Sequence, residues 1–209
     1  VESGQLNENL QSVMTDILTH GNSLGLPERK RPEWTKDLPF VIPDARDSKV
    51  QYLWYVGDLP SYDPRNQKIA KALAHIFNEA GISYGILYDS EKNDGNDVRR
   101  VGEEGLYEML AENNIELFNQ CDFETIVCTD PHSYNTIKNE YPQFGFETNV
   151  RHYTSILEDL VNSGKLIIPP SLDYSVTYHD PCHLGRYNHE YESPRELIKK
   201  TGCVLHEMP

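Results

Sequence analysis

From residue 50 onward the chain alternates between short runs of β-branched and aromatic residues and longer amphipathic segments. The strand-like runs lie at 50–57, 82–88, 124–129, 175–179 and 203–207, and the helical patterns lie at 63–81, 98–118, from 131 onward, 152–163 and 193–202. Strands that alternate with helices of about ten residues or more are joined by right-handed crossovers and form parallel sheets. We therefore predict an α/β fold with a parallel sheet of βαβ units.

The pattern divides the chain into three parts. Residues 1–48 contain an amphipathic helix at 5–19 and then a stretch with two glycines and four prolines, which is typical of an irregular linker. Residues 49–172 form a first α/β half, and residues 173–209 begin a second half that is cut short. We expect the chain to be a piece of a longer protein.

Charge and cysteine content restrict the classes of function. Nineteen Lys and Arg against 33 Asp and Glu give a formal charge of −14, which argues against nucleic-acid binding because that requires a basic patch. Four cysteines without a CxxC pair, together with no signal peptide and no long apolar run, indicate a reducing aqueous compartment. We expect a cytoplasmic protein without direct membrane insertion.

Three Asp-Pro pairs begin predicted helices, at 63–64, 130–131 and 180–181. Aspartate accepts hydrogen bonds from the first turn, and proline supplies a suitable φ there, so N-capping explains the pairs themselves. The stretches TDPHSYN (129–135) and HDPCHLG (179–185) share a preceding strand and a following histidine, which indicates an internal duplication. Because ligands bind beyond the carboxyl ends of parallel strands, we expect convergence there of Asp58, residues 93–95, Asp130–Ser133 and Asp180–His183.

Two common chemistries find little support. No GxGxxG follows the first strand and no GxxxxGK[ST] occurs, so a nucleotide site is not indicated. Cys182 and His183 have the residue types of a thiolate and its base, but neighbours on a helix point about 100° apart. A lone cysteine can equally be a small buried hydrophobe, which is the role we assign to the cysteines at 121, 128 and 203.

Several stretches together resemble the cysteine-rich (CCG) domain proteins, which include the catalytic subunit of heterodisulfide reductase and related iron–sulfur oxidoreductases. They are SYDPRNQKIAKAL, GEEGLYEMLAENNIE, DPHSYNTIKNEYPQFG and, above all, YHDPCHLGRYNHEYESPRELIK. The resemblance extends from about residue 50 to 209. It implies two tandem α/β halves whose strand-end cysteines hold a 4Fe-4S-type cluster, and electron transfer to or from a disulfide, a quinone or a flavoprotein.

The chain departs from that pattern at most of the implied ligand positions. Where relatives have cysteines, it has Asp58, Asn93 followed by Asp94, and, at the third strand end, Asp130 and Ser133; only Cys182 is retained. One thiolate cannot hold a cluster that needs about four. We therefore expect a cluster-free first half and a 4Fe-4S cluster that assembles only in the parent protein, with these candidate cofactor-binding residues here: Cys182, His183, Asp58, Asn93, Asp130 and His132, Cys182 being the metal ligand.

Three hypotheses remain open. The resemblance implies a redox protein whose partners are other subunits of a complex, which could bring it to the cytoplasmic face of the membrane. An interaction or scaffold module would instead dock a basic partner on its acidic surface. A divalent-metal site, as in a metal-dependent hydrolase, would use the oxygen and nitrogen ligands of Asp58, Asp94, Asp130 and His132.

Overall fold

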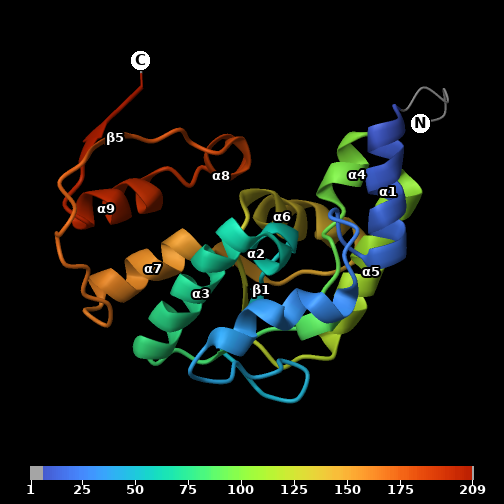
Figure 1. Cartoon of the computed structure of the whole chain (residues 1–209), viewed down its shortest axis with the longest axis horizontal. Helices are drawn as coiled ribbons and strands as arrows, with labels where there is room; N and C mark the ends of the chain where they lie inside the picture. The colour runs from blue at the N-terminus through green and yellow to red at the C-terminus, as the bar shows by residue number, and fades with distance from the viewer. Residues whose placement is uncertain (1–6, 209) are drawn as a thin grey trace.

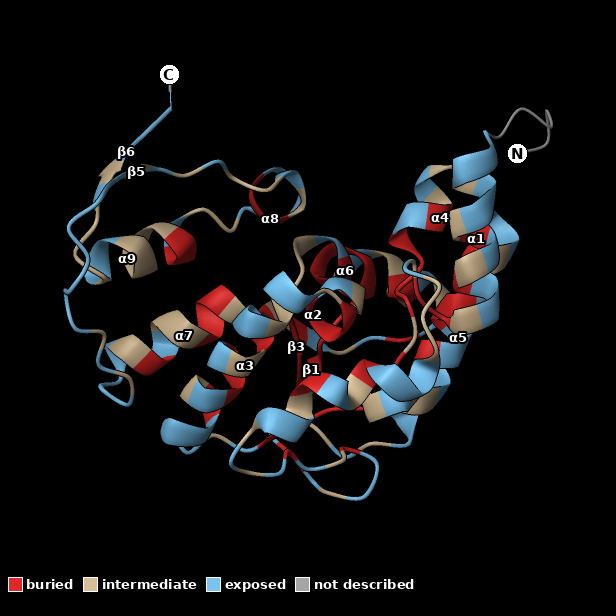
Figure 2. Ribbon diagram, viewed as in Figure 1, coloured by how far each residue is buried: buried red, intermediate tan, exposed pale blue. Residues whose placement is uncertain are grey.

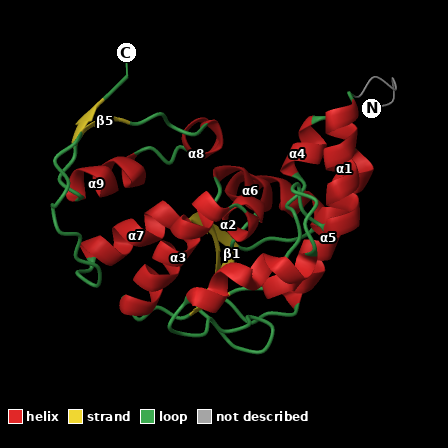
Figure 3. Cartoon of the chain, viewed as in Figure 1, coloured by secondary structure: helices red, strands yellow, loops and turns green. Residues whose placement is uncertain are grey.

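The computed structural model of the chain describes residues 7–208 (Figure 1). Its central sheet has four parallel strands in the order β2–β1–β3–β4. They are β1 (Tyr52–Tyr55), β2 (Tyr84–Gly85), β3 (Thr125–Cys128) and β4 (Asn149–His152). Helices surround this small sheet (Figure 3), so the predicted α/β fold with a parallel sheet is confirmed.

Side chains of the central strands alternate between two hydrophobic cores. Leu53 and Tyr55 of β1 belong to one core, and Trp54 between them belongs to the other. Because successive strand residues point to opposite faces, the sheet is covered on both sides. The strands accordingly form the most buried part of the fold (Figure 2). The first core includes α1 (Glu8–His20) and α5 (Glu104–Asn119), and the second includes α3 (Pro64–Glu79) and α7 (Tyr153–Asn162).

Two of the three Asp-Pro pairs cap helices as predicted. Asp63 accepts from two backbone N–H groups at the start of α3, and Asp130 does the same for α6 (Pro131–Asn135). Asp180 does not cap α8 (Cys182–Asn188), which contradicts the prediction. Its carboxylate instead binds Arg195 of α9 (Glu192–Lys200) through two contacts, at 2.6 and 2.8 Å. A bidentate ion pair outcompetes the local cap here.

Several predicted elements differ in detail. The helix expected at 98–118 is broken by Gly102, whose φ of +88° ends α4 (Asn96–Arg100) before α5 begins. Strand β4 at 149–152 was not predicted. Ser193 is the first residue of the helix predicted at 193–202, the usual place of an N-cap, but it lies inside α9 and donates to Glu158 of α7. The amphipathic pattern at 63–81 places Ile69 of α3 on the face predicted to be buried, yet Ile69 is 48% exposed.

The stretch expected to be an irregular linker packs closely against the sheet. It contains the 3₁₀ helix η1 (Glu28–Asp37), in which Arg31 and Trp34 are buried. The rings of Trp34 and Trp54 of β1 meet edge to face with centroids 5.5 Å apart. Residues beyond η1 also contact the sheet, because Asp44 forms a parallel β-bridge with Ile86, next to β2. The segment before residue 49 therefore shares the second core.

The C-terminal part forms a separate pair of parallel strands, β5 (Ser175–Thr177) and β6 (Val204–His206). Helix α8 lies beside α6, and α9 lies beside α7 (Figure 1). Asn188 of α8 bridges to Asn135 and Asn139 at 3.1 and 3.0 Å. Among residues 7–208, none of the helices has the length and apolar character needed to cross a membrane.

Candidate functional site

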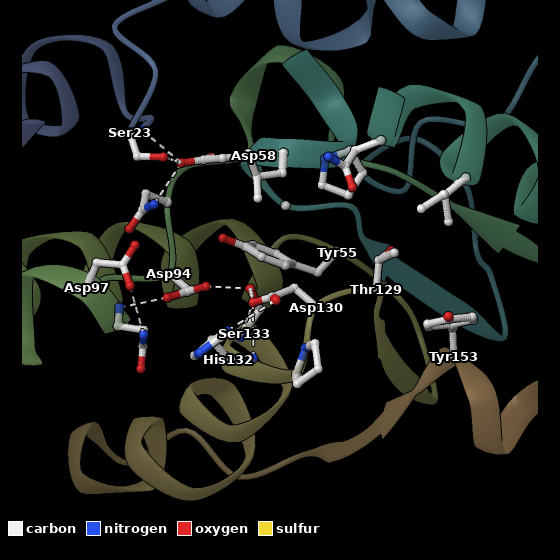
Figure 4. A pocket seen from close by; sticks show the side chains of 18 residues that line it. Ser23, Tyr55, Asp58, Asp94, Asp97, Thr129, Asp130, His132, Ser133 and Tyr153 are labelled. Atoms are coloured by element: carbon white, nitrogen blue, oxygen red, sulfur yellow. Dashed lines mark hydrogen bonds and ion pairs between the residues drawn. The ribbon is translucent and has the colours of Figure 1, made fainter. Parts of the chain in front are cut away.

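A cavity of about 400 Å³ opens at the carboxyl ends of the central strands (Figure 4). Its lining comes from the residues that follow three strands: α2 (Asp58–Tyr62) after β1, the loop at 93–97 after β2, and residues 129–133 after β3. Tyr153, directly after β4, completes it. The convergence predicted for Asp58, residues 93–95 and Asp130–Ser133 is thus present, because parallel strands deliver their ends to one edge. The fourth predicted member, Asp180–His183, does not line the cavity, because it follows β5 of the separate two-stranded sheet.

Asp94 is a buried acid of the cavity. It is 8% exposed, and its carboxylate accepts hydrogen bonds from the Ser133 hydroxyl and, at 2.7 Å, from the backbone N–H of Asn96. Burial raises the pKa of Asp94 to about 7. The hydrogen bond from Ser133 lowers this pKa, and the negative charge of nearby Asp130 raises it further, but both effects are smaller than that of burial. Asp94 therefore changes its charge near neutral pH.

Asp58, predicted as a site residue, is held by the N-terminal segment. Its side chain is 7% exposed and pairs with Arg31 at 2.6 Å. The backbone N–H of Ser23 donates to it at 2.9 Å, and the side-chain amide of Asn93 donates at 2.7 Å. Arg31 also pairs with buried Glu91 at 2.8 Å. This network explains why the segment before residue 49 adheres to the strand ends.

Asn93 fixes the loop after β2. Its backbone N–H donates to Gly21 at 2.8 Å and its side-chain oxygen accepts from Gly95 at 2.9 Å. The side-chain amide of Asn114 donates to the Asn93 carbonyl at 3.0 Å, and Tyr141 donates to the Asp94 carbonyl at 3.0 Å. These contacts hold the loop from both sides, so its geometry is set before any ligand arrives.

Asp130, His132 and His183 lie where α6 and α8 pack together. Nδ1 of His132 is 3.3 Å from Asp130, and this contact raises the pKa of His132. Burial works to raise the pKa of Asp130, but hydrogen bonds from His132 and Ser133 outweigh it and keep that pKa below its usual value. The ring of His183 on α8 lies 4.4 Å from that of His132, and burial together with the nearby His132 lowers the pKa of His183.

Cys182 is exposed at the first position of α8 and does not belong to the cavity lining. Its link to the site runs through the next residue, His183, which contacts His132. Cys128 is fully buried in the first core, where burial raises the pKa of its thiol. Cys121 packs against the same core, and Cys203 accepts from the Thr201 hydroxyl at 3.3 Å. These environments agree with packing roles at 121 and 128.

The donor set does not fit a metal or a cluster carried by this chain alone. Within residues 7–208, no three His, Cys, Asp or Glu side chains are grouped so that they could hold a metal ion. Asp58 faces Arg31 instead of an open coordination position, and Asp94 and Asp130 share the Ser133 hydroxyl. Oxygen and amide groups occupy the strand ends where an iron–sulfur cluster would need thiolates. The divalent-metal arrangement of Asp58, Asp94, Asp130 and His132 is likewise not formed.

Several lining residues were not identified from the sequence, among them Ile69, Thr129 and Tyr153. Ile69 lies on the apolar side of the predicted helix at 63–81, and Tyr153 follows the strand that was not predicted. Thr129 accepts a hydrogen bond from the Trp54 ring nitrogen at 2.7 Å. Burial alternates along this strand: Val150 and His152 are buried, and Arg151 between them is only partly so. An alternation of this kind was the available signal for a strand. Recognising that strand would have placed Tyr153 at the cavity.

Comparison with known proteins adds the family. The model of the cysteine-rich domain CCG matches residues 60–138 and 176–208, which is more than half of the chain. The chain belongs to the CCG cysteine-rich domain family. Both matched segments include residues at the strand ends described above, and the second includes Cys182. No solved structure matches the chain significantly.

Curated relatives of this CCG-domain chain are redox proteins by name. "Probable iron-sulfur-binding oxidoreductase FadF" of Bacillus subtilis is 45% identical over 98% of the chain and 30% of its own length. "EtfAB:quinone oxidoreductase" of Syntrophomonas wolfei is 37% identical over 98% of the chain and 29% of its own length. One component of the dihydromethanophenazine:CoB–CoM heterodisulfide reductase of Methanosarcina acetivorans is 29% identical over 80% of the chain and 42% of its own length. The chain thus spans less than half the length of these relatives.

Proposed function

We propose that this chain is a segment of an iron–sulfur oxidoreductase that transfers electrons to or from a disulfide, a quinone or a flavoprotein. The observation that carries the proposal is its membership of the CCG family together with the names of its relatives. In this proposal residues 49–172 are a first half without a cluster and residues 173–209 begin the second half. Its proposed partners are other subunits of a redox complex. Its proposed location is the cytoplasm, at the cytoplasmic face of the membrane when those subunits bind it there.

Cys182 is the residue that we propose as a ligand of a 4Fe-4S cluster shared with cysteines outside this chain. Its thiol is exposed, and it lies in the second matched segment. Sulfur is the donor that iron–sulfur clusters require, whereas Asp58, Asn93, Asp130 and His132 offer oxygen and nitrogen. We assign those four, with His183, to shaping the strand ends beside the cluster.

The internal hydrogen bonding of the first half supports its proposed cluster-free role. Asp58 is neutralised by Arg31, and the Asn93 side chain binds Asp58 and Gly95. Asp130 caps α6 and accepts from His132. Since these groups are already satisfied, the strand ends need no metal to be stable.

The test is a cysteine variant pair in the longer protein that carries this segment. Anaerobically purified Cys182→Ser protein should lose iron and the electron paramagnetic resonance signal of the reduced cluster. The matched control Cys203→Ser changes a partly buried cysteine next to β6, which pairs with the strand β5 that precedes Cys182. This control should retain both the iron and the signal. If Cys182→Ser retains iron and signal in full, Cys182 is not a ligand and the assignment fails. If the unsubstituted longer protein itself binds no iron, an interaction module with no redox role becomes the better account of the chain.

A further inference from the structure

A groove of about 470 Å³ lies between helices α1 and α5, at the end of the fold remote from α8 and α9 (Figure 1). One face of α1 lines it, because the α1 residues are spaced as i, i+3, i+4 and i+7: Gln11, Met14, Thr15 and Leu18. The other side comes from the start of α5: Glu103, Gly105, Leu106 and Met109. The groove is therefore formed by two helix faces.

The groove exposes large apolar side chains. Leu18 is 59% exposed and Met109 44% exposed, whereas Met14 is 9% exposed and belongs to the first core. Single exposed apolar residues are common on protein surfaces, but a groove that gathers several of them is typical of a docking site. The groove thus offers contact positions for the apolar side chains of another helix.

Gly105 supplies an independent observation. It does not have a positive φ, and a Cβ built on it would meet no atom within 4 Å. Neither the backbone conformation nor the packing among residues 7–208 therefore requires glycine here, although glycine is a poorer helix former than alanine. A residue without a side chain in a groove allows another backbone to approach closely. Docking of a second helix would account for this glycine.

The charge of the two helices indicates the chemistry of that second helix. Residues 8–20 and 104–119 contain no lysine or arginine, and their acids are Glu8, Asp16, Glu104, Glu108, Glu112 and Glu116. Glu108 lies three positions after Gly105, and Glu112 three after Met109, so both lie beside the groove on the helix surface. Within residues 7–208 neither of the two forms an ion pair. A helix with basic residues beside its apolar face matches this groove in charge.

We propose that the α1–α5 groove binds an amphipathic helix of a partner protein whose apolar face is flanked by lysine or arginine. Its apolar residues contact Leu18 and Met109, its backbone crosses Gly105, and its basic residues face Glu108 and Glu112. Helices that bind in grooves use anchors spaced i, i+3, i+4 and i+7. A second copy of the chain fits poorly, because each copy carries a charge of −14.

Fluorescence anisotropy of a labelled 18-residue helical peptide, titrated with the 209-residue chain, tests the proposal. The peptide contains only leucine, alanine and lysine, with the leucines on one face. A peptide of the same composition with the leucines spread around the helix, and a version with glutamate in place of lysine, should each bind at least about tenfold more weakly. Equal affinity for the three peptides, or no saturable binding of the basic amphipathic peptide below about 1 mM, would overturn the proposal.

Variants locate the binding in the groove. Leu18→Ser and Met109→Ser, at exposed positions, should each weaken binding of the basic amphipathic peptide by about tenfold. The matched control Ile167→Ser, at a residue that is 84% exposed outside the groove, should not. Glu108→Gln should weaken binding, whereas Glu79→Gln, at the exposed end of α3, should not. Equal effects inside and outside the groove would overturn the proposal.

Gly105→Leu separates docking from a structural role. The free chain has room for the new side chain and leucine is the better helix former, so the melting temperature should not fall. The same side chain occupies the path of the docked helix and should weaken peptide binding by about tenfold or more. Unchanged binding would overturn the proposal, as would a dimer of the chain that Leu18→Ser dissociates, since a second copy would then be the occupant.

The groove shares no residue with the strand-end cavity and does not include Cys182. The inference therefore goes beyond the proposed redox function and does not rest on it. None of these measurements requires iron, so their outcome leaves the cluster assignment of Cys182 untouched.

Discussion

Replacing Asp94 by asparagine should stabilise the protein at high pH and not at low pH. The pKa of Asp94 rises from 3.8 to about 7 on folding because burial penalises its charged form. The folded state therefore binds more protons than the unfolded state between about pH 4 and pH 7. The free energy of unfolding must fall as pH rises through that range, and the loss is complete once the pH exceeds the folded pKa.

The magnitude follows from the two pKa values. A difference of about three units at 1.36 kcal/mol each corresponds to about 4 kcal/mol of destabilisation above pH 7. Asparagine carries no charge, can still accept from the Asn96 N–H, and can donate to the Ser133 hydroxyl, which is within reach of Asp130 at 3.4 Å. Asp94→Asn should then be more stable than the parent by about 2–4 kcal/mol at pH 8 and within about 1 kcal/mol of it at pH 5.

Urea unfolding at pH 5, 6, 7 and 8 measures this difference, with fluorescence of the buried Trp34 and Trp54 as the signal. Asp97→Asn is the matched control, because it removes the same charge from an exposed position three residues away. The difference between the two variants isolates burial from net charge. A stability difference for Asp94→Asn that stays constant between pH 5 and pH 8 would refute the reasoning.

Three further predictions follow from the contacts described. Arg31→Met should lower the free energy of unfolding in urea by about 3–5 kcal/mol, because Asp58 and Glu91 would remain buried without their cation. Arg29→Met, at an exposed neighbouring position, should lower it little. Equal losses in the two variants would contradict the role of the ion pairs. In native protein the exposed Cys182 should react with a thiol reagent first and the buried Cys128 only after unfolding, and rapid reaction of Cys128 would contradict its place in the core. Addition of Mg²⁺, Mn²⁺ or Zn²⁺ should leave the melting temperature unchanged, because residues 7–208 offer no grouped ligands and only a ligand that binds the folded state would raise it.

The fold was largely predictable from local patterns. Strand composition, helical periodicity and the capping pairs at Asp63 and Asp130 act over a few residues, so the sequence displays them directly. The convergence of Asp58, Asn93 and Asp130 followed from one topological rule about parallel strands. These features needed no knowledge of distant contacts.

What could not be predicted depends on contacts between distant residues. Arg31 lies 27 residues before Asp58 and 60 before Glu91, and nothing in its local pattern distinguishes it from the exposed Arg29 two positions earlier. The same is true of Asp180, whose pairing with Arg195 replaces the expected cap. Charged residues pair with residues that are close in the fold but distant in the sequence. Their burial therefore has no periodic pattern in the sequence.

The measurement that tests the central claim most directly is the iron and acid-labile sulfide content of the 209-residue chain after anaerobic reconstitution and desalting. We expect no stoichiometric retention of either, because Asp58, Asn93, Asp94, Asp130 and Ser133 offer hydrogen-bonded oxygen and amide groups where a cluster needs thiolates. Retention of a full cluster by this chain, and its persistence in the Cys182→Ser variant, would contradict the cluster-free first half.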